Sequence, residues 1–526
     1  MSGEDDPPRY DVSDAWNLCI TAFGKHFMYW VLAMGAAPAS PPPGPSLSTK
    51  QGDIIQRLSG LAMEVPPFAL EQGRSPFLPP TREWLALRGQ CGGSLPVEAP
   101  TDDALLAATA ALAEIVYAPL LARSARRVGT NYAILPSALI SQVPEFAAFA
   151  DALRCDTIWG MFSQGPSLRT NVGRLRCPDD ACLASYLLSQ AWDIALLRGQ
   201  FGLDSYRTAA VWALENLRAS LDGNGKYSVF LGFRGCITPP YPLNLDRVSI
   251  YPYSSDLQFS LLPSDALPSL ELGDLRWTGF VAEVQFPFRI MPVGVDDGDD
   301  GDEAKEHMQS VARWSENIAL AIALARLPEG KLRGHEARRG GSPSLYPSAP
   351  VDSWQRWARP LMVPHVLSNT TLPVASCSLD DEHVESLEGI LKALVGSPLQ
   401  VAIVRVLMAL QRPRSPDFGL IDTMIAWESI AGDSKDAISL ITRSVLSSLV
   451  FAKGSRAEGR KRIKEIYGVR NRIVHGVCSP DSHENLREDT ATAIEIALRA
   501  LRSLHLEEGG QFLTKRDRFS AMFLDS

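Results

Sequence analysis

Hydrophobic residues recur at helical spacing through the first 220 positions of the chain. Alanine and leucine line one face of each segment, and proline-rich stretches such as APASPPPGPS separate the segments. This pattern predicts helices over 12–34, 102–127, 145–162, 180–197 and 205–221. Residues 1–225 are therefore expected to form a helical N-terminal region.

The period of the hydrophobic positions changes to two at Lys226. Tyr227, Val229, Leu231 and Phe233 alternate with other residues, which predicts a strand with one apolar face. Segments 246–253 and 278–290 alternate in the same way. We expect a small sheet within residues 226–292.

Helical spacing returns in the last part of the chain. It predicts six helices, over 380–394, 399–411, 417–431, 435–452, 456–475 and 481–506. The breaks between them are short and rich in Gly, Pro, Ser and Asp, so neighbouring helices should pack antiparallel as a bundle.

These elements predict a predominantly helical α+β protein. We divide it into a helical region 1–225, a sheet-containing middle region 226–375, a helical bundle 376–510 and a C-terminal tail 511–526. The middle region also holds an acidic loop, 295–303, and a Gly/Pro/Arg-rich connection, 328–350. The acidic loop does not have the ligand spacing of a calcium loop.

Composition indicates a soluble, cytoplasmic protein. Of 526 residues 45% are hydrophobic and 21% charged, and the formal net charge is −9. The eight cysteines show no disulfide or zinc spacing, so we expect reduced and mostly buried thiols, with no metal and no cofactor. The acidic start MSGEDDPPRY does not resemble a signal peptide, and the apolar run 104–122 contains Glu114 and Pro119, which favours a core helix over a membrane span.

The segment 456–475 departs from this acidic background. It carries seven Lys or Arg residues against two Glu, which indicates a local site for an anion. Helical spacing places Ile463, Ile466, Tyr467, Ile473 and Val474 on one apolar stripe.

Arg470 falls within that stripe, so its guanidinium is expected at an interface, where it needs a partner. Arg470 and His475 are separated by about 140° around a straight helix, whereas Asn471 and His475 share a face. One helix therefore presents Arg470 and His475 poorly to a single phosphate. Two copies across a two-fold axis would bring both kinds of group into one cleft.

The run RIKEIYGVRNRIVHG, with the upstream LIDTMIAWESIAG, resembles the Apea-like branch of the HEPN superfamily. Members of this superfamily are helical bundles with an Arg, usually a polar residue, a few further positions and then a His. Arg470, Asn471 and His475 match these positions, and the resemblance covers about the last quarter of the chain. It implies a metal-independent ribonuclease that acts as a homodimer or a higher homo-oligomer.

By this resemblance His475 would be the general base or acid at the RNA 2′-hydroxyl or the leaving oxygen, and Arg470 would stabilise charge on the scissile phosphate. Asn471 would orient the histidine or the phosphate by hydrogen bonding. Glu428 and Tyr467 would support the site, with Glu428 able to pair with Arg470. The RNA backbone would be held by Lys461, Arg462, Lys464 and Arg472.

Several interpretations stay open. The first is an endoribonuclease effector of a bacterial anti-phage or toxin-type system, in which the N-terminal part senses a phage-derived or cellular activator. The alternative is a non-catalytic HEPN-type module that dimerises and binds RNA or nucleotide in an interaction protein. In that case His475 only ends a helix before Gly476, and Arg470 forms a structural salt bridge with Glu428. Chemistry in the N-terminal region is a third possibility, without a motif to support it.

Overall fold

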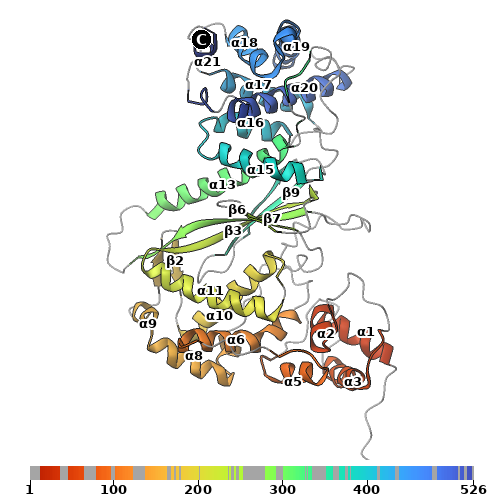
Figure 1. Cartoon of the computed structure of the whole chain (residues 1–526), viewed down its shortest axis with the longest axis vertical. Coiled ribbons are helices and arrows are strands. Elements are labelled where there is room, and N and C mark those ends of the chain that lie inside the picture. The colour runs from red at the N-terminus through yellow and green to blue at the C-terminus, as the bar shows by residue number, and fades with distance from the viewer. Residues whose placement is uncertain are drawn as a thin grey trace, which may run out of the picture.

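A computed structural model shows two helical parts with a sheet between them (Figure 1). The chain is a predominantly helical α+β protein, as predicted. The structure describes residues 12–35, 45–63, 79–95, 101–122, 137–162, 167–170, 173–176, 179–200, 202–234, 236–237, 242–244, 248–252, 279–291, 300–325, 327, 330–333, 351–358, 366–372, 377–378, 381–410, 415–432, 438–476, 483–507, 510–514 and 518–523.

The N-terminal part consists of short and medium helices and one small hairpin. Its elements are α1 (Val12–Phe23), α2 (Lys25–Val31), α3 (Thr49–Met63), α5 (Glu83–Gln90), α6 (Ala104–Leu121), α7 (Ser137–Ile140), α8 (Pro144–Arg154), α9 (Thr157–Phe162), β1 (Ser167–Thr170), β2 (Gly173–Arg176), α10 (Asp180–Leu197) and α11 (Leu203–Leu221). The prediction of α10 is confirmed at both ends, and α11 begins two residues early. Helix α6 ends at Leu121, before the predicted residue 127.

Two predicted helices are wrong because each is interrupted. The helix over 12–34 breaks at Gly24, whose φ of 82° lies in the left-handed region that glycine adopts without a steric penalty. The helix over 145–162 breaks at Cys155 and Asp156, where the Asp156 carboxylate accepts the backbone N–H of Ile158 at 2.9 Å and starts α9. The apolar period continues across both breaks, so it did not reveal them.

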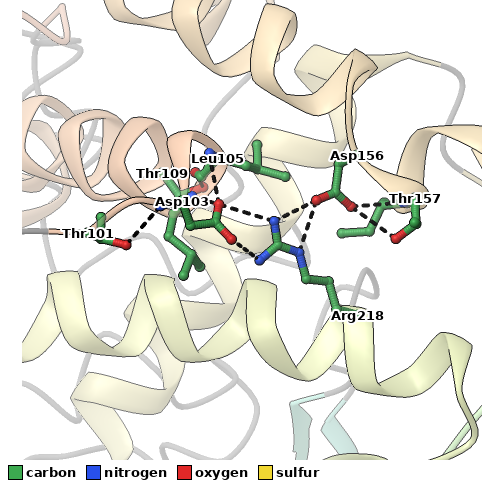
Figure 2. Close-up of polar contacts among 9 residues, drawn as sticks. Thr101, Asp103, Leu105, Thr109, Asp156, Thr157 and Arg218 are labelled. Carbon is green, nitrogen blue, oxygen red and sulfur yellow. Dashed lines mark hydrogen bonds and ion pairs between the residues drawn. The ribbon is translucent and has the colours of Figure 1, made fainter.

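Arg218 ties three helices of this part together (Figure 2). Asp103 caps α6 through the N–H groups of Leu105 and Leu106, and Asp156 caps α9. From α11, Arg218 Nη1 donates to Asp103 Oδ2 at 2.6 Å, and Arg218 Nη2 donates to Asp156 Oδ2 at 2.5 Å. One guanidinium thus joins the carboxylates that begin two other helices.

The main sheet has six strands in the order β10-β9-β3-β7-β6-β5, and all of its pairs are antiparallel. Its strands are β3 (Gly225–Arg234), β5 (Leu243–Asn244), β6 (Val248–Pro252), β7 (Gly279–Phe288), β9 (Val351–Ala358) and β10 (Val366–Leu372); β8 (Ile290–Met291) joins β1, and β4 (Cys236–Ile237) pairs with β11 (Cys377–Ser378).

The predicted strands at 226–234, 246–253 and 278–290 are confirmed as β3, β6 and β7. The sequence did not predict β9 and β10, because Val351, Trp354 and Trp357 are three residues apart and give no two-residue period. Parts of the predicted acidic loop and of the Gly/Pro/Arg-rich connection lie outside the described residues, and positions 300–303 belong to α13 (Asp300–Ala325).

A buried ion pair joins the sheet to the N-terminal helices. Glu283 on β7 is 2% exposed, and its carboxylate accepts hydrogen bonds from Arg198 Nε at 2.8 Å and Arg198 Nη2 at 2.6 Å. The hydroxyls of Ser228 and Tyr251 also donate to it. Burial alone would raise the pKa of Glu283, but Arg198 and the two hydroxyls hold it below its ordinary value.

The C-terminal bundle contains the six predicted helices. They are α15 (Asp381–Leu394), α16 (Gln400–Leu410), α17 (Pro416–Ala431), α18 (Ile438–Val450), α19 (Arg456–Val474) and α20 (His483–Arg502), with short turns η3 (Lys453–Ser455) and η5 (Ser503–Glu507). Helix α13 packs against α15, α16 and α20, so it covers one side of this bundle. Helix α21 (Arg518–Phe523) packs on α18, and Arg518 donates to the Ile430 carbonyl near the end of α17 at 3.1 Å.

Among the described residues, Ala104–Leu121 is the one helix long and apolar enough to cross a membrane. Within the fold it is a core helix, because 72% of this segment is buried. The prediction of mostly buried thiols is wrong for the described cysteines, since Cys19 is buried, Cys91 and Cys182 are half-buried and Cys155 is exposed.

Candidate functional site

Helix α19 runs unbroken through Arg470 and Asn471 to Val474, the residue before His475. Gly468 does not interrupt it. His475 is its C-terminal cap and is exposed, with its backbone N–H bonded to the Asn471 carbonyl at 3.1 Å. Gly476 follows with a φ of 69°, as is common after the last helical residue. His475 therefore projects from the end of α19 with its side chain accessible to solvent.

The predicted apolar stripe forms most of the buried face of α19. Ile463 and Ile466 are fully buried, and the Tyr467 ring lies 5.9 Å from the ring of Trp427 on α17. The prediction is wrong for Val474, which is 52% exposed, because α19 ends there and its last turn is left uncovered by the described helices.

Arg470 is half-buried at the edge of this stripe. Its Nη1 donates to Asn471 Oδ1 at 3.2 Å, while its Nε is buried and has no hydrogen-bond partner among the described residues. No ion pair joins Arg470 to Glu428 in the described part of the chain. The guanidinium is therefore bound only to its sequence neighbour, and most of its donors are left for another partner.

Two buried hydroxyls lie on α18 and α19, which pack against each other. Tyr467 Oη and Thr442 Oγ1 are both buried, and neither makes a hydrogen bond of good geometry with a described residue. Burial raises the pKa of Tyr467 to about 12, and the charge of Glu428 also raises it. Contact with Thr442 and the charges of Arg470 and Arg443 lower it.

The predicted RNA-binding residues divide into two groups. Lys461, Lys464 and Arg472 are exposed and have no ion pair among the described residues. Arg462 instead turns toward α20, where its Nη2 donates to Asp489 Oδ1 at 2.7 Å. Arg462 thus holds α19 against α20, and its contact with RNA stays a prediction.

No sequence pattern indicated that Thr442 and Arg443 lie near Tyr467. They lie on α18, about 25 positions before Tyr467, in a segment with ordinary helical spacing. They reach Tyr467 because α18 packs on α19. Only the packing of the two helices brings these side chains together.

Two glycines of α19 differ in how closely they pack against the rest of the fold, so substitutions at the two positions can be compared. A Cβ at Gly459 would lie 2.6 Å from the Phe451 ring, whereas a Cβ at Gly468 meets nothing within 4 Å. Gly459→Ala is expected to destabilise the protein by about 1–2 kcal/mol, because the clash exceeds the gain in helix propensity. Gly468→Ala should stabilise it by about 0.5–1 kcal/mol.

Urea unfolding of both glycine variants measures this difference. Equal changes in the two variants would contradict the close approach of α19 to Phe451.

No family model, curated protein or solved structure matches the chain. Among the described residues, no group of three or more His, Cys, Asp and Glu side chains is arranged to hold a metal ion.

Proposed function

We propose that this protein is a metal-independent endoribonuclease whose active site lies at the C-terminal end of α19. The observation that carries the proposal is the state of Arg470, a half-buried guanidinium that bonds only Asn471 and has a buried Nε without a partner. His475 is exposed five positions further along the chain, and Lys461, Lys464 and Arg472 are exposed positive charges on the same helix. This set suits a polyanion, in a chain whose net charge is −9.

The chemistry follows from these groups. In RNA cleavage without a metal, the 2′-oxygen attacks the adjacent phosphorus and the bond to the 5′-oxygen breaks. Histidine suits the two proton transfers, from the 2′-hydroxyl and to the leaving oxygen, because its ordinary pKa is near neutrality. Arg470 would stabilise the charge that develops on the phosphate, and Asn471 would hold that guanidinium in place.

We further propose that the complete site needs two copies of the chain. His475 caps the end of α19, while Arg470 points toward the edge of its buried face, so one helix presents them in different directions. A two-fold dimer through the bundle would place the Arg470 of one copy near the His475 of the other.

The proposal extends to an effector of a bacterial anti-phage or toxin-type system in the cytoplasm, restrained by residues 1–375. One contact supports such control. Leu332, in the segment that leaves α13, donates its N–H to the Val450 carbonyl at 2.8 Å, and its carbonyl accepts the Ala452 N–H at 3.0 Å. This strand-like contact joins the middle region to the turn that begins α19.

A second candidate function is a non-catalytic module that binds RNA or nucleotide. It is favoured by the position of His475, which ends α19 before a left-handed Gly476 and so has a structural role without any chemistry.

Incubation of purified protein with RNA in EDTA tests the proposal. We expect wild type to cleave, and His475→Ala and Arg470→Ala each to lose activity by about 100-fold or more. Arg487→Ala, an exposed arginine on α20, is the control and should cleave like wild type. RNA bound but left intact by wild type would favour the binding module, and cleavage that persists in both site variants would exclude this site.

The oligomeric state is measured separately by light scattering. A protein that cleaves RNA as a monomer at micromolar concentration would contradict the shared site.

A further inference from the structure

Residues 330–333, which follow α13, lie against the turn between α18 and α19. Leu332 donates its backbone N–H to the Val450 carbonyl at 2.8 Å, and its own carbonyl accepts the Ala452 N–H at 3.0 Å. Leu332 therefore forms a parallel bridge with Phe451, and it is only 8% exposed. We call residues 330–333 the strap.

Side-chain hydrogen bonds also hold the strap on the bundle. Lys331 Nζ donates to the Ser448 carbonyl at 3.2 Å, and Arg499 Nη1 of α20 donates to the Gly330 carbonyl at 2.9 Å. The last carbonyls of a helix have no partner within that helix. The strap supplies partners for Ser448 and Val450 in the last turn of α18, so it docks at one defined place.

The strap fixes the residue against which the start of α19 packs. Phe451 is fully buried, and a Cβ at Gly459 would lie 2.6 Å from its ring, so α19 approaches this ring closely. Leu332 bonds the backbone on both sides of Phe451, at Val450 and Ala452. The position of the Phe451 ring, and with it the start of α19, therefore depends on the strap.

Helix α19 connects this contact to the proposed active site. The helix is unbroken from Arg456 to Val474, and Arg470 lies about 16 Å along it from Gly459. A displacement at the start of the helix therefore also displaces Arg470, and a shift of about 1 Å is enough to slow a reaction. On its other side the strap leads along the chain to β9, which pairs with β3 in the main sheet.

We propose that the strap is the device by which the middle region controls the site on α19. The docked strap holds the start of α19 and so keeps Arg470 and Asn471 in position. A movement of the middle region that withdraws the strap removes this support, and RNA cleavage falls. Leu332 and Phe451 are thus positioning residues, which do not touch the RNA. This inference rests on the proposed function, because the activity that the strap controls is RNA cleavage.

Leu332→Ala tests the proposal, because it keeps the backbone of the strap and removes its buried side chain. We expect kcat for RNA cleavage to fall by about tenfold. The Kd for RNA should stay unchanged, since Lys461 and Lys464 remain exposed on α19. Val401→Ala, at a position on α16 that is 58% exposed, is the control and should cleave like wild type.

Hydrogen exchange measured by mass spectrometry detects the docking of the strap directly. The Ala452 N–H is bonded to the Leu332 carbonyl, so Leu332→Ala should speed exchange within residues 450–454 by about tenfold. Exchange within α17 should not change. Phe451→Leu should also lower kcat, and the double variant should lower it no further than the stronger single variant, because both residues act through one contact.

Two results would overturn this inference alone, in a protein whose wild type cleaves RNA. One is Leu332→Ala with the kcat of wild type. The other is faster exchange throughout the bundle of Leu332→Ala, α17 included, which would show that Leu332 serves only the stability of the fold. Wild type that does not cleave RNA would overturn the proposed function, and the control of that activity with it.

Discussion

Glu283→Gln is expected to lower the free energy of unfolding by about 3–5 kcal/mol, because it leaves the Arg198 guanidinium half-buried without its carboxylate. Glu283 accepts four hydrogen bonds, two from Arg198 and one each from Ser228 and Tyr251. A glutamine amide keeps one acceptor oxygen and turns an NH₂ group toward these donors. The change therefore removes the charge and breaks the hydrogen-bond network at once.

Urea unfolding measures the effect of Glu283→Gln, with Glu215→Gln as the control. Glu215 is an exposed residue on α11 with no ion pair among the described residues, so its replacement should change stability by less than about 0.5 kcal/mol. If Glu283→Gln lowers the free energy of unfolding no more than Glu215→Gln does, the buried ion pair contributes no net stability.

The Glu283–Arg198 ion pair also predicts that the stability of the protein depends on pH. Because the folded-state pKa of Glu283 is lowered, its contribution to stability is fully present above the ordinary carboxyl pKa of about 4.3 and is lost as the pH falls through the folded value. The difference in unfolding free energy between wild type and Glu283→Gln should therefore be largest near pH 7 and shrink below about pH 4. A constant difference between these pH values would contradict the lowered pKa.

Arg218→Met is expected to cost about 2–3 kcal/mol, since it leaves Asp103 and Asp156 facing each other without the cation between them (Figure 2). The estimate is below that for a fully buried pair, because Arg218 and Asp103 are 26% and 33% exposed. Arg218→Lys should recover only part of the loss, because one ammonium group cannot form the same paired hydrogen bonds with two carboxylates.

Thermal unfolding of these variants is compared with that of Arg154→Met. Arg154 also contacts two aspartates, Asp151 and Asp180, but is 53% exposed, so its loss should cost at most about 1 kcal/mol. Asp103→Asn adds a second comparison, since it keeps an oxygen that caps α6 and removes only the charge. Equal losses of stability in Arg218→Met and Arg154→Met would contradict the proposal that Arg218 holds α6, α9 and α11 together.

Only part of the candidate site could be predicted from local sequence. Helical spacing predicted Arg470 within an apolar stripe, and the structure finds it half-buried at the edge of that stripe. The spacing did not show that Arg462 turns to Asp489 on α20, or that α18 brings Thr442 near Tyr467. These contacts join different helices, and the residue pattern of one helix does not show which side chains of another helix will pack against it.

The sequence by itself determined the helices of the C-terminal bundle, the long strands β3 and β7, and the position of the basic segment on one helix. The period of the apolar residues fixes such elements, because each must bury one face. Only the tertiary structure decided that β9 lies beside β3, that Gly24 and Asp156 divide predicted helices, and which charges meet in the interior. Those features depend on backbone conformation at single residues and on packing between distant segments, neither of which a local period encodes.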